Sequence, residues 1–480
     1  MRKLIVLERP ESWSLNVPGV ETVAAENYLL GQEFHSSSRT RVFNLCRSYR
    51  YQTVGYYVSL LASARGHRPV PSVHTMQELR VPAVVRIATE ELEPEIARAL
   101  RELKTDRFFL SIYFGRNLAK CYDRVSRLLF EQFPVPFLRA DFRKRDGWKL
   151  DRLRAIAVED IPATHRTFVE EQAQRHFARP PARRRNTHRF DLAILSDTSE
   201  ADSPSNAKAL ERFERAAKKV GLTPYFIGHE QLSRIAEYDA LFIRETTAVN
   251  HPSFRFAQRA AAEGLIVIDD PESILRCSNK VFLAEAFAAR AIPAPRTLLV
   301  HRSNLDEIVS GAPIPCVVKR PDSSFSQGVS KATSRVELRE HLITALENSE
   351  LVLVQGFIAS EFDWRVGVLG GRPLYTCRYH FPRGEWRIQT AAPDGTRRYG
   401  RVETVAADDA PKAVVDLAVR AANTVGQGLY GVDLKANDEG IFVIEVNDNP
   451  NIDAGYEDKV LGRTLYETVM RYFVDRLVAR

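Results

Sequence analysis

Short hydrophobic segments in the middle of the chain alternate with longer segments of helical periodicity. Strands are predicted at the short apolar runs, residues 191–195, 223–227, 240–244 and 265–268. Amphipathic helices are predicted between them, at residues 206–220 and 254–263. Because alternating strands and helices build parallel sheets, residues 190–275 are expected to form a doubly wound α/β domain.

The first 178 residues show a similar mixture of elements. A strand is predicted over residues 41–46, and a helix over residues 53–66 that ends at a glycine followed by Pro69. No catalytic group of side chains stands out in this part. Residues 1–178 are therefore expected to form an additional N-terminal α/β domain without an assigned role, joined to the rest by a basic, proline-containing linker at 179–189.

From about residue 276 the pattern changes to longer helices that alternate with hairpin-like strands. Helices are predicted at residues 278–291 and 410–425 and from about residue 463, and strands at 316–319 and 351–355. Residues 363–369 and 374–380 are expected to pair antiparallel around a Gly370-Gly371 turn. This α+β part is expected to form two lobes, 276–350 and 351–480.

The last predicted hairpin carries candidate metal ligands. With a three-residue loop at Asp438 to Gly440, counting back along both strands places Asp433 opposite Glu445. Asn447 lies two residues beyond Glu445 and therefore on the same face. Magnesium favours such oxygen donors together with nucleotide phosphates. The alternative interpretation is a solvated hairpin with ordinary polar positions.

Phosphate-handling features precede this hairpin. Lys280 begins a predicted helix, Lys319 ends an apolar strand, and a polar, glycine-containing loop follows at residues 322–330. Further along stand an apolar strand end at residues 354–358 and then Glu361, Asp363 and Arg365. Each lysine could equally be a surface residue, but triphosphate chemistry needs cations, a cover and a metal together.

Two common nucleotide motifs are excluded. The segment 426–431 matches GxGxxG, but it follows a helix and precedes a strand, which is the reverse of the dinucleotide-binding arrangement. The chain contains no Gly-Lys pair and hence no Walker A motif.

Composition adds to this picture. The net charge is +7, which suits an anionic nucleotide and an acidic second substrate. The run from Arg179 to Arg185 is interpreted as a solvated linker, with nucleic-acid binding as the alternative, because no aromatic-rich RNA-binding signature or Cys/His finger accompanies it. Five scattered cysteines predict reduced thiols and a cytoplasmic location, and no apolar run predicts a membrane segment.

Taken in order, these segments resemble the ATP-grasp superfamily and, within it, the RimK-like ligases. The resemblance covers residues 190–480 and implies a doubly wound domain followed by two lobes that clasp ATP. It implies phosphate and adenine-side contacts for a set of residues, namely Lys280, Lys319, Ser326, Gln327, Gly328, Gln355, Gly356, Phe357 and Ile358, and a ribose contact for Glu361.

The same resemblance implies the remaining site residues. Arg365 would contact phosphate or acyl phosphate, and Asn449, which follows the family's last polar contact, would be a further catalytic residue. The three magnesium ligands of the family match Asp433, Glu445 and Asn447. The family's cover loop is often richer in glycine than the loop here, and Arg387-Ile388-Gln389 only loosely matches an Arg-x-Asn element that faces the acyl acceptor.

The sequence thus predicts an ATP-dependent carboxylate–amine ligase that forms an amide or peptide bond through an acyl phosphate and releases ADP and phosphate. Its cofactors would be ATP and Mg²⁺, with Mn²⁺ as a replacement. Arg378 and Arg387, if their strands face the cleft, would hold a substrate carboxylate, although both could be surface arginines. The expected partner is an amino acid, peptide or protein, and a homo-oligomer is compatible with the sequence. The alternative function is a catalytically silent ATP-binding regulatory or scaffold protein.

Overall fold

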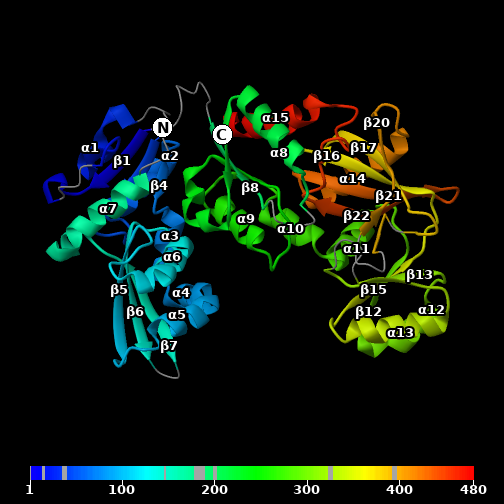
Figure 1. Ribbon diagram of the computed structural model, residues 1–480, viewed down its shortest axis with the longest axis horizontal. Coiled ribbons are helices and arrows are strands. Elements are labelled where there is room, and N and C mark those ends of the chain that lie inside the picture. Colours follow the sequence, from blue (N-terminus) through cyan, green and yellow to red (C-terminus); the bar gives the residue numbers. More distant parts are fainter. Residues whose placement is uncertain are drawn as a thin grey trace. The chain divides into compact units, whose positions relative to one another are not determined.

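A computed structural model describes residues 2–12, 17–34, 40–144, 147–177, 190–197, 200, 203–322, 328–386, 388–391 and 397–479 (Figure 1). The chain divides into two compact units. The first comprises Met1–Asn186 and Glu230–Glu237, and the second comprises Thr187–His229 and Tyr238–Arg480. Each unit is described by itself.

The first unit contains two sheets. Parallel strands form one of them in the order β2-β1-β3-β4, with β1 at Arg2–Leu7, β2 at Glu21–Ala24, β3 at Thr40–Asn44 and β4 at Arg68–Val70. Antiparallel strands form the other, with β5 at Arg107–Tyr113, β6 at Phe137–Lys144 and β7 at Trp148–Ala155. The helices are α1 (Ala25–Leu30), α2 (Val54–Ala64), α3 (Val73–Arg80), α4 (Pro82–Thr89), α5 (Glu93–Leu100), α6 (Asp123–Gln132) and α7 (Arg166–Phe177).

The second unit begins with a parallel sheet in the order β11-β10-β8-β9. Its strands and helices alternate along the chain as β8 (Phe190–Leu195), α8 (Ala207–Lys219), β9 (Leu222–Ile227), β10 (Ala240–Ile243), α9 (Pro252–Ala262) and β11 (Ile266–Ile268). Each predicted strand and helix of this part is found within two residues of its expected bounds. The apolar strands β8, β10 and β11 are almost completely buried, which explains why the pattern was easy to recognise.

An antiparallel sheet follows, in the order β12-β15-β13-β14. Its strands are β12 (Thr297–Val300), β13 (Cys316–Lys319), β14 (Val329–Ala332) and β15 (Val352–Gly356), and its helices are α12 (Leu305–Gly311) and α13 (Arg335–Leu346). Leu338, Leu342 and Leu346 of α13 pack into one apolar core with Val318 and Val354 of the sheet. This core holds the predicted phosphate-side strand β13 in place.

A five-stranded antiparallel sheet completes the unit, in the order β20-β17-β16-β21-β22. Its strands are β16 (Phe362–Leu369), β17 (Arg372–His380), β20 (Val402–Val405), β21 (Leu429–Asn437) and β22 (Gly440–Asp448). Helix α14 (Lys412–Val425) packs in the core on one face, and α15 (Arg463–Val478) contributes to a core that also contains Leu369 and Tyr375. The short strands β18 (Gln389–Ala391) and β19 (Arg397–Tyr399) pair with each other.

The helix predicted over residues 278–291 is found as α11 (Lys280–Ala289), and a separate helix that the sequence did not predict, α10 (Pro271–Cys277), precedes it. The Asn279 side chain accepts hydrogen bonds from the backbone N–H groups of Val281 and Phe282, at 3.0 and 3.2 Å. An asparagine in this position caps a new helix and ends the continuity with the preceding one. Lys280 is consequently the first residue of α11.

In the hairpin of β21 and β22, Asp433 is paired with Glu445 as predicted, but the loop and the register that produce this pairing differ from the prediction. Its loop contains two residues, not three, because Asn437 pairs with Gly440. A bulge then inserts Ile444 opposite the Asp433–Leu434 step, and Asp433 pairs with Glu445. The error in loop length and the unrecognised bulge cancel, since a bulge shifts the register by one residue.

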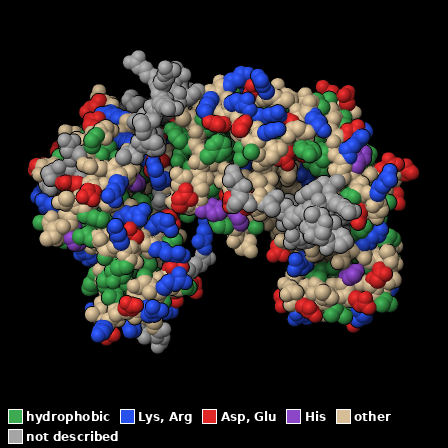
Figure 2. Space-filling view, viewed as in Figure 1, with side chains coloured by type: hydrophobic (Ala, Val, Ile, Leu, Met, Phe, Trp, Pro, Cys, Tyr) green, Lys and Arg blue, Asp and Glu red, His purple; other side chains and the backbone are tan. Residues whose placement is uncertain are grey.

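No helix in the described part of the chain is long and apolar enough to cross a membrane. Acidic and basic side chains are mixed over the face of the molecule shown in Figure 2. The fold is a mixed α/β fold with α+β lobes, as expected.

Candidate active site

Strands β21 and β22 bring two carboxylates and an amide together. Asp433 and Glu445 are directly opposite in the antiparallel ladder, so their side chains share one face of the sheet. The Asn447 Nδ2 atom donates a hydrogen bond to Asp433 Oδ2 at 3.1 Å. All three predicted metal ligands therefore lie on one face.

Arg365 fixes the orientation of Asp433 from the neighbouring strand β16. Arg365 pairs with Asp433 in the ladder, and its guanidinium donates to both carboxylate oxygens, with 2.8 Å between Nη2 and Oδ2. Burial opposes the charge of this guanidinium, but the Asp433 carboxylate outweighs it and raises the pKa of Arg365 well above its ordinary value. The arginine is thus a permanent cation in the site.

Two lysines flank Glu445. Lys280 Nζ lies 2.8 Å from Glu445 Oε1. Burial would raise the pKa of Glu445, but the ammonium groups of Lys280 and Lys319 hold it below its ordinary value. Burial lowers the pKa of Lys319 to about 8, against the opposing charge of Glu445.

A cavity of about 150 Å³ connects these groups with the β12–β15 sheet. Predicted nucleotide-side and metal-side residues both line it, together with apolar residues that the sequence did not single out. Its walls comprise Lys280, Val317, Lys319, Val329, Gln355, Gly356, Phe357, Ile358, Asp363, Trp386, Ile388, Asp433, Lys435, Ile444 and Glu445. One end is charged and the other is apolar and aromatic, which suits a phosphate-bearing aromatic ligand.

The predicted adenine segment forms the apolar end. Gln355 accepts a hydrogen bond from Lys319 Nζ at 2.7 Å and donates one to Thr297 Oγ1 at 3.1 Å. The backbone N–H groups of Gly356 and Phe357 donate to backbone carbonyls at 2.9 and 3.2 Å. Because these two N–H groups are already used, hydrogen bonds to adenine would have to come from the other backbone groups of residues 355–358.

Lys435 and Asp363 are further polar members of this cavity. Lys435 lies two residues after Asp433 on β21, so alternation places it on the same face. Its Nζ donates to Ser360 Oγ at 2.9 Å and forms an ion pair with Asp363. Burial raises the pKa of Asp363 to about 6, against the ammonium of Lys435. The spacing of Lys435 from Asp433 could have identified it from the sequence.

Asn449 is engaged by the protein itself. Its Oδ1 accepts a hydrogen bond from Arg244 Nη1 at 2.7 Å, and its Nδ2 donates to the backbone carbonyl of Glu245. Arg244 is completely buried and also donates to Pro204, Ser205 and Pro450. Both ends of the amide are therefore used by the protein, and they tie the end of β22 to the segment that follows β10. The catalytic role of Asn449 stays a prediction.

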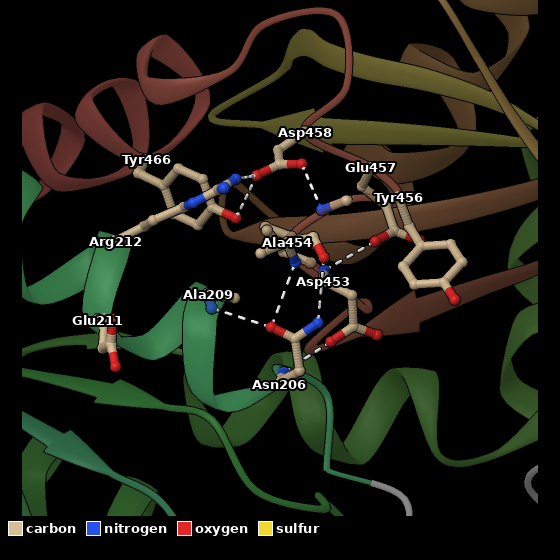
Figure 3. Close-up of polar contacts among 12 residues, drawn as sticks. Asn206, Ala209, Glu211, Arg212, Asp453, Ala454, Tyr456, Glu457, Asp458 and Tyr466 are labelled. Atoms are coloured by element: carbon tan, nitrogen blue, oxygen red, sulfur yellow. Dashed lines mark hydrogen bonds and ion pairs between the residues drawn. The ribbon is translucent and has the colours of Figure 1, made fainter.

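The segment after β22 is anchored in the same way (Figure 3). Asn206, at the start of α8, donates its backbone N–H to Asp453 Oδ1 at 2.6 Å and its side chain to the carbonyl of Ala454 at 3.3 Å. Asp458 forms an ion pair with Arg212 of α8 and accepts from the Tyr466 hydroxyl at 2.8 Å. These contacts fix the chain that leaves the metal-candidate strand.

The sequence analysis placed Arg378 on the cleft face of its strand, but the structure places it on the opposite face of the sheet. It pairs with Trp364 on β16, whose side chain belongs to the core beside α14, so Arg378 lies on the face of the sheet opposite Arg365. Its guanidinium stacks 4.8 Å from the centre of the Trp364 ring. One residue of register separates the two faces, and the prediction chose the wrong one.

The other predicted residues have mixed outcomes. Glu361 is exposed just before β16 and is not part of the cavity wall. Gly328 precedes β14 with a φ of +66°, and a Cβ atom there would lie 2.4 Å from Arg320 Nε. Ser326, Gln327 and Arg387, like the linker 179–189, lie outside the described residues.

The donor set fits a hard divalent cation. It offers two carboxylates and one amide on adjoining ladder positions and no sulfur or imidazole. No group of three or more His, Cys, Asp or Glu that could hold a metal occurs within the described ranges. A cation held by Asp433, Glu445 and Asn447 would therefore need ligands from elsewhere, and nucleotide phosphates are the usual ones.

Two family models match this chain. Residues 25–172 match the RimK-like ATPgrasp N-terminal domain, and residues 277–465 match the RimK-like ATP-grasp domain. Among curated proteins, a probable alpha-L-glutamate ligase from Maridesulfovibrio salexigens is 26% identical over 227 residues, covering 46% of this chain and 71% of the relative. A protein of the same name from Vibrio vulnificus is 26% identical over 226 residues, with the same two coverages.

The sequence identity to similar solved structures is lower than the identity to the curated proteins. A D-alanine–D-alanine ligase from Bacillus anthracis has a TM-score of 0.47 at 13% identity, covering 61% of this chain and 98% of that one. A RimK domain protein from Sphaerobacter thermophilus has a TM-score of 0.45 at 15% identity, covering 59% of this chain and 98% of that one.

The first match identifies residues 25–172 as a RimK-like ATPgrasp N-terminal domain. The second spans the elements that carry Lys280, Arg365, Asp433 and Glu445. This protein belongs to the RimK-like ATP-grasp family of ATP-dependent carboxylate–amine ligases.

Proposed function

We propose that this ligase activates a substrate carboxylate as an acyl phosphate in the cavity between β13–β15 and β16–β22, and joins it to an amine. The observation that carries the proposal is the pairing of Asp433 with Glu445 beside Lys280, Lys319 and Arg365. Cations and oxygen donors at one end of a cavity are what phosphoryl transfer requires.

Each side chain has a specific part in this proposal. Lys319 and Lys280 bind phosphate oxygens and balance the charge that develops on the transferred group. Arg365 does the same from the other side while it keeps Asp433 in place. The segment from Gln355 to Ile358, including the Phe357 ring, receives the adenine. Lys331 Nζ lies 3.6 Å from the centre of that ring.

We assign Asp433, Glu445 and Asn447 as the residues that would hold Mg²⁺, with Mn²⁺ as a replacement. The ion would supply positive charge next to the nucleotide phosphates. In its absence Lys280 and Arg365 neutralise the two carboxylates. The same cations can turn toward phosphate oxygens when the ion takes their place.

The substrates follow from chemistry and from the relatives. The reaction consumes a carboxylate and an amine, and the similar curated proteins are named alpha-L-glutamate ligases. We propose glutamate as one substrate and an amino acid, peptide or protein as the other. The balanced reaction is carboxylate plus amine plus ATP, giving amide, ADP and phosphate, with the amine losing a proton as phosphate departs.

Product analysis tests this function. The protein is incubated with ATP, Mg²⁺, glutamate and a peptide mixture, and nucleotides are separated by chromatography. We expect ADP to form only when both a carboxylate and an amine are present. AMP and pyrophosphate would contradict the acyl phosphate route, and magnesium-dependent ATP binding without ADP on any acceptor would favour a silent scaffold.

A further inference from the structure

The open face of the three-stranded sheet in the first unit carries an array of cations. The ladder aligns Arg107 of β5 with Arg143 of β6 and Lys149 of β7, and two residues away it aligns Phe109 with Asp141 and Arg152. A third row aligns Ser111 with Arg139 and Arg154. Directly opposed residues share a face, so all six cations project from one side. We call this set the basic sheet face.

The reverse side of this sheet is packed. Leu110, Leu138, Ala140 and Phe142 belong to a buried core with α4, α5 and α6, which lie on one side of the strands in Figure 1. These three helices cover that side, and α7 meets the other face at the end of β5, where Phe168 contacts the Tyr113 ring. The basic sheet face is left open, with Arg107, Lys149 and Arg152 exposed and 59% of the Phe109 side chain accessible.

Few carboxylates neutralise this array. Arg143 lies 3.3 Å from Asp151, and Lys149 lies 3.3 Å from Glu93. Within the described ranges, no carboxylate pairs with Arg107, Arg152 or Arg154. Charge is also unevenly distributed along the chain: residues 1–186 contain 32 Lys and Arg against 21 Asp and Glu, whereas residues 187–480 contain 36 against 40. The first unit is where an anionic partner is attracted.

We propose that the basic sheet face binds an extended acidic polypeptide segment. Five of the six cations are arginines, whose planar groups bind carboxylates in a bidentate manner. Alternate residues of an extended peptide repeat every ~7 Å, which matches the separation of Arg152 and Arg154 along β7. This inference assigns a role to the first unit and does not depend on the proposed ligase chemistry.

One observation favours a polypeptide over single-stranded nucleic acid. Successive bases need several aromatic platforms. Tyr113 and Phe137, which continue the face, are both buried, and Phe109 is the one exposed aromatic side chain among the described residues of this face.

The test compares two double variants of the full chain. Arg107→Glu with Arg152→Glu changes the basic sheet face, and Arg80→Glu with Arg101→Glu makes the same charge change at other exposed arginines of the first unit. Binding of a fluorescein-labelled decaglutamate peptide is measured by anisotropy at low and physiological salt. We expect the first variant to bind roughly tenfold more weakly at low salt and the second to change less than about twofold.

Three outcomes would overturn the proposal. Equal loss in both double variants would show a diffuse charge effect without a defined surface. No binding by the unchanged protein would exclude the partner. Tighter binding of an oligouridylate of equal charge, lost in the first variant only, would assign the face to nucleic acid. Thermal melts of both variants check folding, and binding of a fluorescent ATP analogue checks that the second unit is unaffected.

Discussion

If Lys319 binds nucleotide phosphate as proposed, we predict that the affinity for ATP falls as the pH rises above about 8. Its Nζ donates to Gln355 in the cavity, and burial lowers the pKa of this ammonium group to about 8. Nucleotide phosphates favour the charged lysine, so bound ATP keeps Lys319 protonated. In the free protein, raising the pH through 8 removes that proton, and binding must then restore it.

The magnitude follows from the fraction of protonated lysine. With a pKa of about 8, this fraction falls roughly tenfold between pH 7 and pH 9, and ATP affinity falls by up to the same factor. A tenfold change corresponds to about 1.4 kcal/mol of binding free energy. Affinity should be flat below pH 7 and should decline with increasing slope above pH 8.

The assay is titration of a non-hydrolysable ATP analogue by calorimetry at several pH values and constant ionic strength. Lys319→Arg is the control, because a guanidinium stays charged throughout this range. The control should bind with a flat profile. A flat profile for the unchanged protein, or an equal decline in Lys319→Arg, would refute the reasoning.

Three further predictions concern single side chains. Glu445→Gln should lower kcat by at least about a hundredfold through loss of a charged oxygen donor, while Glu439→Gln on the exposed turn of the same hairpin should leave kcat within about twofold; equal rates for the two variants would reject the metal assignment. Arg378→Met should leave the KM values for both substrates within about twofold, because the residue lies on the other face of the sheet, and a large KM increase in steady-state assays would restore the original prediction. Asn449→Ala should lower the free energy of unfolding by about 2–4 kcal/mol because it deprives a buried guanidinium of an acceptor, whereas exposed Asn348→Ala should change it by less than about 0.5 kcal/mol in denaturant titrations.

Local patterns predicted most of the elements of the second unit. The apolar runs of β8, β10 and β11 are buried on both faces, so hydrophobicity alone marks them. The Gly370-Gly371 turn was equally visible, since both glycines have positive φ values that other residues rarely adopt. Helix α11 was predicted as well, and the Asn279 cap sets its first residue two positions after the predicted start.

The face of the sheet from which a side chain projects, and the register between paired strands, were harder to predict. Arg378 and Arg365 lie on adjoining paired strands, and only the pairing of Arg378 with Trp364 shows that they project from opposite faces. The bulge at Ile444 has no glycine or proline beside it that would have indicated it in the sequence. Register of this kind depends on contacts across strands, which a single sequence does not display.

The candidate site was predicted where the chemistry demands particular atoms. Asp433, Glu445 and Lys280 combine charge with defined positions at strand and helix ends, and they meet as expected. The position of Asn449 depends on Arg244, more than 200 residues earlier in the chain, and no local pattern predicts that contact. Long-range hydrogen bonds of buried polar groups are the part of the site that required the structure.

Transfer of an isotope from substrate to phosphate tests the central claim most directly. Glutamate or the reacting peptide is labelled with ¹⁸O in its carboxylate, and inorganic phosphate is analysed by mass spectrometry after turnover with ATP. Activation as an acyl phosphate predicts one ¹⁸O atom in each phosphate released with the amide product. Unlabelled phosphate, or label that appears in AMP, would contradict it.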